Sequence, residues 1–476
     1  MFPNIRNNNT QVLAIIFIVF LIKYLISLYL FSSKFSLSVD EAQYWFWSQN
    51  LEWGYYSKPP LIAFFIRIFT ILFGNSEVAL KIIPNLCVAV TSWFIFKLAT
   101  VITNARIGTI SIIIFSLMPI ILFGSFCVTT DTLLVMFWSI ALYTLYLSLK
   151  TNSLFYWFIF GLISALGLLS KYAFIFFYPC LFLYLFIFRR ERLRLDRVLL
   201  SLLVTLIIIA PNIYWNMQHH FITFDHVARD NMSLFNKMYN PTGVVKFLIE
   251  QIGCLGLNVI ILGFAFHKKV YKDKTQQFLL CFSLPIFVLI FIQALIKGAD
   301  SNWTAPAFVS LSIYLAIVVD RLSIKKIYLC SLMITISIIV LIIGWLFLGL
   351  SSAMLPYKRI EGFRQLTNII REDVCNDKSQ VYLFNDRRTA AQISYYLRSC
   401  YNKIEYYGKN TDIRNYYQMK YPFSQRENYL FFLNSLSNKD GVVGYDETKN
   451  LSYSYKIHPK KNLEVKVLHL KKSKNK

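Results

Sequence analysis

Long apolar runs separated by short polar connections fill most of the chain and predict its fold class. A bilayer core about 30 Å thick is crossed by about 20 predominantly apolar residues in a helix. Runs near that length occur at residues 12–32, 80–101, 107–123, 132–149, 155–169, 172–188, 198–213, 248–266, 278–296, 304–320 and 327–350. Lys23 interrupts the first run and no small-residue cleavage site follows it, which favours a retained anchor over a signal peptide. The pattern predicts about eleven transmembrane helices in a mainly α, polytopic membrane domain over residues 1–352.

The run Pro59–Phe73 is different because it has only 15 residues and carries Arg67. At 1.5 Å per residue such a helix is about 22 Å long, too short to cross the bilayer upright. We predict an in-plane juxtamembrane helix at the membrane surface. The basic connections Arg189–Arg197, Lys268–Lys274 and Arg321–Lys326 then share the side of the N-terminus, which the positive-inside rule makes cytoplasmic. Residues 33–78, 124–131, 212–246, 297–303 and the tail after residue 352 are expected on the periplasmic side of a bacterial inner membrane.

The tail has a different pattern. Short apolar segments at Val381–Phe384 and Tyr429–Leu433 alternate with a helical pattern at Thr389–Leu397, which predicts a small soluble α/β domain over residues 353–476. Cys375 and Cys400 lie in this tail. In an oxidising periplasm we predict a disulfide between them. Two unpaired thiols stay equally open, because the sequence gives no distance between the two cysteines.

Composition supports a lipid environment. Of the 476 residues, 56% are hydrophobic and 16% are charged, whereas a soluble globular protein carries roughly 25% charged residues. The net charge of +24 is spread over the connections and the tail rather than gathered in one polar domain, which argues against a nucleic-acid binder. Membrane lipids are therefore expected partners, and nucleic acid is not.

Acidic side chains beside a bilayer are costly, so those near the ends of predicted spans are functional candidates. Asp40 and Glu41 follow the first span, and Asp131 begins the fourth span on the same predicted side. Either aspartate could instead serve only as a helix cap or a partner of the helix dipole.

Two lysines lie on the same predicted side. Lys58 precedes Pro59-Pro60 in an aromatic stretch, and Lys171 separates two apolar runs. A cation at headgroup depth can bind a lipid phosphate, although a lysine there can also snorkel to ordinary headgroups. Acids as general bases and lysines as phosphate contacts suit the transfer of a group from a lipid-linked phosphate to an acceptor. Since the periplasm offers no nucleotide sugars, a lipid-linked sugar is the expected donor.

Five motifs occur in a fixed order: Asp-Glu-Ala-Gln-Tyr-Trp at 40–45, Gly-Tyr-Tyr-Ser-Lys-Pro-Pro-Leu at 54–61, Thr-Thr-Asp-Thr at 129–132, Leu-Leu-Ser-Lys-Tyr at 168–172 and Asn-Trp-Thr-Ala-Pro at 302–306. The set resembles the bacterial family 39/83 glycosyltransferases, relatives of dolichyl-phosphate-mannose protein mannosyltransferases and of lipid A aminoarabinose transferases. The resemblance covers about residues 10–350. It implies the GT-C membrane fold, a polyprenyl (undecaprenyl) phosphate sugar donor and inversion at the anomeric carbon.

The resemblance also suggests roles for single residues. Asp40 and Asp131 look like the two catalytic acids, and Glu41 beside Asp40 is a third catalytic candidate. Candidates for binding the donor lipid phosphate are Lys58, Lys171, Tyr44 and Tyr55.

Two departures from the aminoarabinose branch bear on the substrate. That branch resembles Asp-Glu-Thr-Arg-Tyr in the first loop, whereas this chain has Ala42 and Gln43 and lacks the arginine. The aminoarabinose branch also has an acidic residue at the position that Ser57 occupies in this chain. Both differences weaken an assignment of aminoarabinose and of a metal site, so no cofactor or metal is predicted. A predicted outer loop carries three histidines, His219, His220 and His226. We expect their side chains to be solvated or to face lipid headgroups rather than to bind a metal.

The sequence thus predicts a glycosyltransferase that moves a sugar from a polyprenyl phosphate to a periplasmic lipid or glycan acceptor, with lipid A or another part of lipopolysaccharide expected. A transporter or flippase for a lipid-linked sugar is the alternative class, but such proteins tend to show paired repeats and charges at the bilayer midplane. A non-catalytic scaffold would leave Asp40, Lys58 and Asp131 without a purpose. We expect these three side chains to meet around one cavity.

Overall fold

The computed structural model describes residues 9–33, 35–188, 194–226, 241–268, 273–296, 298–347, 362–376, 380–408, 413–434, 442, 445–458 and 461–473. The domain boundary predicted at residue 352 lies outside these ranges, as do most residues of the basic connections 189–197 and 268–274.

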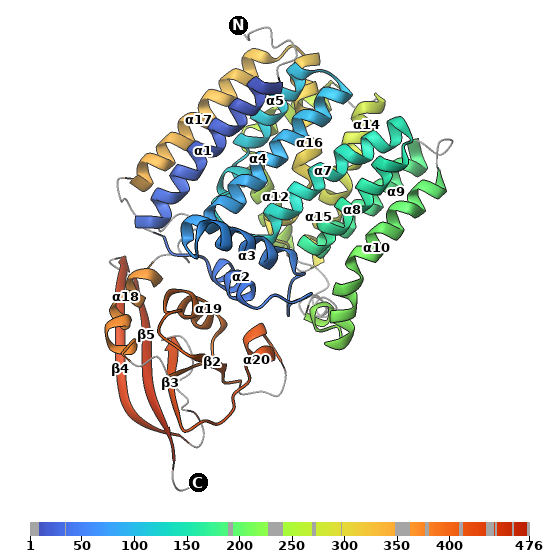
Figure 1. Ribbon diagram of the computed structural model, residues 1–476. Helices are drawn as coiled ribbons and strands as arrows, with labels where there is room; N and C mark the ends of the chain where they lie inside the picture. The colour runs from blue at the N-terminus through green and yellow to red at the C-terminus, as the bar shows by residue number, and fades with distance from the viewer. Residues whose placement is uncertain are drawn as a thin grey trace.

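Helices form the larger part of the molecule and pack into a bundle, with a smaller sheet domain at one end (Figure 1). Each of the eleven predicted runs falls on a helix or on a pair of consecutive helices, so the mainly helical architecture is confirmed. The bundle and its flanking helices are α1 (Asn9–Ser33), α2 (Val39–Gln49), α3 (Leu61–Phe73), α4 (Glu77–Ile102), α5 (Ala105–Leu117), α6 (Pro119–Gly124), α7 (Thr130–Thr151), α8 (Leu154–Ser170), η1 (Tyr172–Phe176), α9 (Phe177–Phe188), α10 (Leu195–Gln218), α12 (Pro241–Leu255), α13 (Asn258–His267), α14 (Lys274–Cys281), α15 (Leu284–Ile296), η3 (Ser301–Thr304), α16 (Ala307–Arg321) and α17 (Lys325–Phe347).

The helices differ in length from the predicted spans. Within the described ranges, six helices are long and apolar enough to cross a membrane, or seven if α12 and α13 count as one span. These two helices meet at 104°, so the prediction of one continuous helix over residues 248–266 is wrong. The chain turns at Gly256, whose φ of +59° is a left-handed conformation that glycine adopts without a steric penalty.

The distribution of exposed apolar side chains agrees with lipid as the solvent. α16 is buried from Ala307 to Val319, as expected for a helix that is apolar on all sides and lies inside a bundle. In contrast, Phe17 on α1 is 62% exposed and Leu341 on α17 is 72% exposed. Exposed apolar surface of this kind marks a face that meets a membrane or a partner.

Two short helices, α2 and α3, lie at the end of the bundle that faces the sheet domain (Figure 1). α2 begins with a capping box, in which Ser38 Oγ accepts a hydrogen bond from Glu41 N at 3.2 Å and Glu41 Oε2 accepts one from Ser38 N at 2.9 Å. α3 occupies the predicted in-plane segment and is a helix of 13 residues. Its position at the membrane surface stays a prediction.

The C-terminal part is a small sheet domain, as predicted. Its five-stranded sheet has the order β2-β1-β3-β5-β4, in which β1 is parallel to β2 and β3, while β5 is antiparallel to β3 and β4. The predicted strand Val381–Phe384 is observed with the same bounds. Cys375 and Cys400 form a disulfide, which confirms the predicted bridge. The elements are α18 (Phe363–Val374), β1 (Val381–Phe384), α19 (Arg387–Tyr396), β2 (Lys403–Tyr406), α20 (Tyr416–Lys420), β3 (Asn428–Asn434), β4 (Tyr445–His458) and β5 (Lys461–Lys472).

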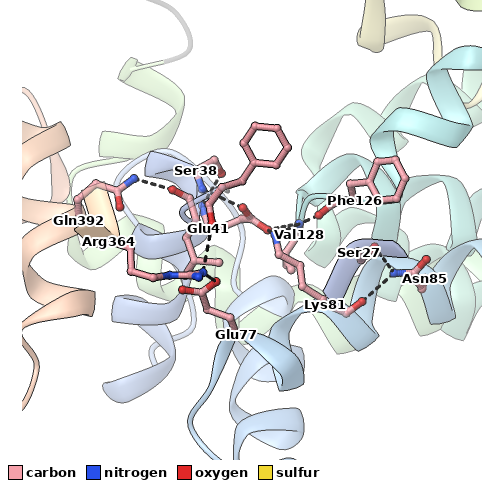
Figure 2. Close-up of polar contacts among 12 residues, drawn as sticks. Ser27, Ser38, Glu41, Glu77, Lys81, Asn85, Phe126, Val128, Arg364 and Gln392 are labelled. Atoms are coloured by element: carbon pink, nitrogen blue, oxygen red, sulfur yellow. Dashed lines mark hydrogen bonds and ion pairs between the residues drawn. The ribbon is translucent and has the colours of Figure 1, made fainter. Parts of the chain in front are cut away.

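Buried hydrogen bonds fasten this domain to the bundle. Arg364 on α18 forms an ion pair with Glu77 at the start of α4 (Figure 2). Gln392 Nε2 donates to the carbonyl of Leu37 at 2.7 Å, and the hydroxyl of Tyr396 accepts from Leu37 N at 2.8 Å and donates to Glu77 at 2.9 Å. Because these contacts occupy the backbone just before α2, they fix α19 against that helix.

Candidate active site

Glu41 anchors α2 to the bundle. Its side chain and that of Lys81 on α4 are completely buried, with 2.5 Å between Lys81 Nζ and Glu41 Oε1 (Figure 2). Glu41 also accepts hydrogen bonds from Val128 N at 2.8 Å and Ser38 N at 2.9 Å. A buried carboxylate whose oxygens are taken up by protein donors is stabilised in place and is not available to a substrate. The structure thus places the Glu41 side chain in a buried ion pair, away from Asp40's partner Arg387, and its catalytic role stays a prediction from the sequence.

Asp40, the neighbouring residue on α2, points its carboxylate toward the sheet domain. Its side chain is 54% exposed. Oδ1 accepts hydrogen bonds from both terminal nitrogens of Arg387, at 3.2 and 3.1 Å, and Arg387 also donates to Gln43 Oε1 at 2.7 Å. The N-cap of α2 is Ser38, so capping does not account for Asp40. Sequence reasoning missed Arg387, because 347 residues separate it from Asp40 and no motif links the two.

Asp131 lies in the first turn of α7 and binds two polar groups from other elements. Lys171 Nζ lies 2.6 Å from Asp131 Oδ1, and Asn302 Nδ2 donates to Oδ2 at 3.1 Å. The N-cap of α7 is Thr129, whose hydroxyl accepts from Thr132 N. Three of the five sequence motifs therefore meet at this carboxylate. The ion pair is partly shielded, with 16% of the lysine and 18% of the aspartate side chain exposed.

Lys58 and Tyr44 lie close enough to these charges to have their pKa values shifted by them. Burial and then the Lys171 ammonium lower the pKa of Lys58, while Asp131 and Asp40 act in the opposite direction. The pKa of Tyr44 is raised well above its usual value by burial, next by Asp40 and by Asp131. Lys58 forms no ion pair with any residue of the described ranges. Lys58 thus lies within electrostatic reach of Asp40, Asp131, Lys171 and Arg387, and these five residues are called the charged cluster below.

The loop that carries Lys58 is held tightly. Gly54 packs against the ring of Trp215, where an added Cβ would lie 2.3 Å from the nearest ring atom. The hydroxyl of Tyr55 donates to the carbonyl of Trp47 at 3.1 Å and accepts from Glu52 N at 3.2 Å. The rings of Tyr55 and Trp47 stack with centroids 4.5 Å apart. These contacts fix Tyr55 within the loop, and its contact with the donor phosphate stays a prediction.

Two of the three histidines considered as metal ligands, His219 and His226, make contacts with aromatic neighbours. His219 Nδ1 lies 2.8 Å from the carbonyl oxygen of Trp215 and the two rings stack at 3.9 Å. His226 packs its ring 4.9 Å from that of Tyr56. No group of three or more His, Cys, Asp or Glu side chains that could hold a metal ion occurs in the ranges that the structure describes.

A cavity of about 140 Å³ lies beside Asp131, within the bundle. Apolar side chains of α4, α5, α6 and α7 line most of it, including Val88, Phe115, Ile121 and Val135. Asp131 and Asn302 supply polar groups to its wall. Asp131 thus adjoins a mostly apolar space.

Sequence comparisons relate the chain to known proteins. Residues 57–215 match the family model of dolichyl-phosphate-mannose-protein mannosyltransferase. The lipid A galacturonosyltransferase RgtD of Rhizobium johnstonii is 31% identical over 279 residues, which are 57% of this chain and 58% of the relative. The chain thus spans less than two thirds of the length of that curated relative.

Solved structures show the fold class. ArnT from Cupriavidus metallidurans, crystallised with undecaprenyl phosphate, has a TM-score of 0.67 at 14% identity, over 97% of this chain and 98% of that chain. The oligosaccharyltransferase of Archaeoglobus fulgidus has a TM-score of 0.50 at 14% identity, over 81% of this chain and 62% of that chain. The protein therefore has the GT-C fold. Together with the sequence matches, this confirms the resemblance to the GT-C, ArnT/PMT-like glycosyltransferases that the five motifs indicate.

Proposed function

We propose that this protein is an integral membrane glycosyltransferase that transfers a sugar from a polyprenyl phosphate to lipid A. One observation carries the proposal: Lys58 lies within electrostatic reach of Asp40 and of the Asp131–Lys171 pair, and Asp131 lines a mostly apolar cavity, on a GT-C fold. The named relatives support its two substrates. ArnT was crystallised with undecaprenyl phosphate, and RgtD is named for galacturonosyl transfer to lipid A.

Lys58 is the cation best suited to the donor phosphate. Its ammonium has no counter-ion among the described residues and lies near Lys171. Two ammonium groups in a partly dehydrated site attract a phosphate strongly, because both are shielded from water. Asp131 holds Lys171 in place, with 2.6 Å between Lys171 Nζ and Asp131 Oδ1, and Asn302 Nδ2 donates to the other oxygen of that carboxylate at 3.1 Å. The apolar cavity beside Asp131 would receive the first part of the lipid chain.

Asp40 is the proposed general base. Oδ1 is bound to Arg387, whereas Oδ2 accepts no hydrogen bond from the described residues. Oδ2 takes the proton of an acceptor hydroxyl as the hydroxyl oxygen attacks the anomeric carbon. The bond from that carbon to the phosphate oxygen breaks, and the phosphate leaves with the electron pair. Lys58 and Lys171 stabilise the charge that develops on the phosphate, and attack opposite the leaving group inverts the anomeric carbon.

We further propose that the charged cluster faces the periplasm of a bacterial inner membrane. Two things support this orientation: the basic connections fall on the opposite side by the positive-inside rule, and the Cys375–Cys400 disulfide suits an oxidising compartment.

Mass spectrometry of lipid A tests the function. Cells that contain the protein should show lipid A with an added sugar mass that is absent from cells without it. Asp40→Asn should abolish the addition while leaving the unfolding temperature unchanged. Asp320→Asn is the matched control, because it removes a carboxylate from an exposed ion pair with Arg106 at the end of α16. Lipid A that is identical with and without the protein would rule out this acceptor, and sugar transfer by Asp40→Asn would remove Asp40 from the base role.

A further inference from the structure

The sheet domain contributes a charged side chain to the cluster. Arg387 is the first residue of α19, and both of its terminal nitrogens contact Asp40 Oδ1, at 3.2 and 3.1 Å. One of them also donates to Gln43 Oε1 at 2.7 Å. A guanidinium that holds two acceptors one turn apart on α2 restricts the rotation of the Asp40 carboxylate. It also leaves Oδ2 of Asp40 without a partner among the described residues.

The position of Arg387 is determined by the packing of α19. Asp386 caps this helix by accepting hydrogen bonds from Thr389 N and Thr389 Oγ1, both at 2.9 Å. Farther along the helix, Gln392 binds the carbonyl of Leu37 at 2.7 Å. The ring of Tyr395 meets that of Trp45 edge to face, with centroids 4.9 Å apart. The cap fixes the first turn of α19, and Gln392 and Tyr395 hold the helix against α2 and the residues just before it, so Arg387 is delivered to Asp40 by a rigid element.

The sequence of α2 shows why the guanidinium comes from elsewhere in the chain. Position 43 lies three residues after Asp40, so on a helix the two side chains are neighbours. A neutral amide occupies this position, so α2 itself places no cation beside Asp40. Gln43 is almost fully buried at 2% exposure and serves as an acceptor for Arg387. The positive charge beside Asp40 is therefore supplied by the C-terminal domain.

We propose that Arg387 is a positioning residue for Asp40 and that the C-terminal domain thereby completes the active site. This inference rests on the proposed function. Arg387 orients the carboxylate so that Oδ2 faces the acceptor hydroxyl, and sugar transfer requires the sheet domain to be docked on α2. Loss of orientation at a reacting group costs up to about a hundredfold in rate. The effect should fall on turnover rather than on donor binding, because the phosphate contacts are Lys58 and Lys171.

Four variants test this role: Arg387→Ala, Arg387→Lys, the double variant Gln43→Arg with Arg387→Ala, and Arg388→Ala. Arg388 is the matched control, since it is the next residue on α19 and is exposed. Rates are measured with membranes of the producing cells as the source of donor and with purified lipid A as the varied acceptor. Binding of undecaprenyl phosphate is measured separately by its effect on the unfolding temperature.

Arg387→Ala should lower kcat about tenfold to a hundredfold with an unchanged response to undecaprenyl phosphate. Arg388→Ala should match the wild type, and Arg387→Lys should retain more turnover than Arg387→Ala. The double variant should recover most of the lost turnover, because an arginine at position 43 returns a guanidinium to Asp40 from its own helix. A merely structural role of Arg387 predicts no such rescue.

Equal turnover in Arg387→Ala and Arg388→Ala would overturn the inference. So would a loss of turnover in Arg387→Ala that Gln43→Arg does not relieve. If the wild type itself adds no sugar, the proposed function fails, whereas an active wild type with an unaffected Arg387→Ala variant refutes only the positioning role.

Discussion

Replacing Lys81 by methionine should destabilise the fold far more than any change at Asp40. Lys81 and Glu41 are both 0% exposed and form a direct ion pair. Without the lysine, the Glu41 carboxylate stays buried without a counter-ion, and removing one partner of a buried pair costs about 3–5 kcal/mol. Domains are stable by about 5–15 kcal/mol in total, so the loss is a large fraction of the stability.

Glu41→Gln should have a cost of similar size. Its amide keeps one acceptor oxygen, but the NH2 group replaces an oxygen that now receives hydrogen bonds, at 2.9 Å from Ser38 N or at 2.8 Å from Val128 N. The double variant Glu41→Gln with Lys81→Met should be more stable than the sum of the two single changes predicts. With both side chains replaced, no buried charge is left without a counter-ion. Coupling between residues in contact is about 0.5–3 kcal/mol.

The assay is unfolding of the purified protein in detergent by SDS titration, followed by tryptophan fluorescence. Asp40→Asn is the comparison on the same helix, since its exposed ion pair with Arg387 contributes at most about 1 kcal/mol. Losses below about 1 kcal/mol for both Lys81→Met and Glu41→Gln would refute the structural role of the pair. Strict additivity in the double variant would show that the two side chains are not coupled.

Three further predictions concern the cations and the disulfide. The pKa of Lys58 is held below its usual 10.5 by burial and by Lys171, and only the charged form attracts phosphate. Affinity for undecaprenyl phosphate should therefore fall as pH rises through that lowered pKa, and in Lys58→Arg the fall should come at higher pH. Coincident curves of affinity against pH for the wild type and Lys58→Arg would contradict this. Lys171→Met should weaken undecaprenyl phosphate binding about tenfold or more, since a hydrogen bond to a charged group contributes about 1.5–3 kcal/mol, and a calorimetric titration that matches the wild type would exclude Lys171 from the site. Replacing Cys375 and Cys400 by serine should cost about 3.5 kcal/mol of stability in a chain-entropy model for a loop of 25 residues. Alkylation of the unreduced wild type at both thiols would disprove the bridge.

The apolar pattern was sufficient to predict the helix bundle, because crossing a bilayer requires long apolar helices whatever their neighbours are. The alternation of short strands and a helix in the tail likewise predicted the sheet domain, with β1 observed over the predicted residues. Asp131 and Lys171 were predicted separately, as an acid and a cation on the same side of the membrane, and their ion pair at 2.6 Å appears only in the structure. Each of these predictions depends on local pattern or on residue type near a span end.

Other features depend on which distant segments pack together, and only the tertiary structure decided them. Adjacent acids on α2 received different environments: Glu41 turns into the bundle toward Lys81, and Asp40 turns toward Arg387. The helix break at Gly256 interrupts a run whose composition alone predicts continuity. Sequence determines which side chains are charged and which segments are helical, but burial and the choice of ion-pair partner arise from contacts over hundreds of residues, which no local pattern encodes.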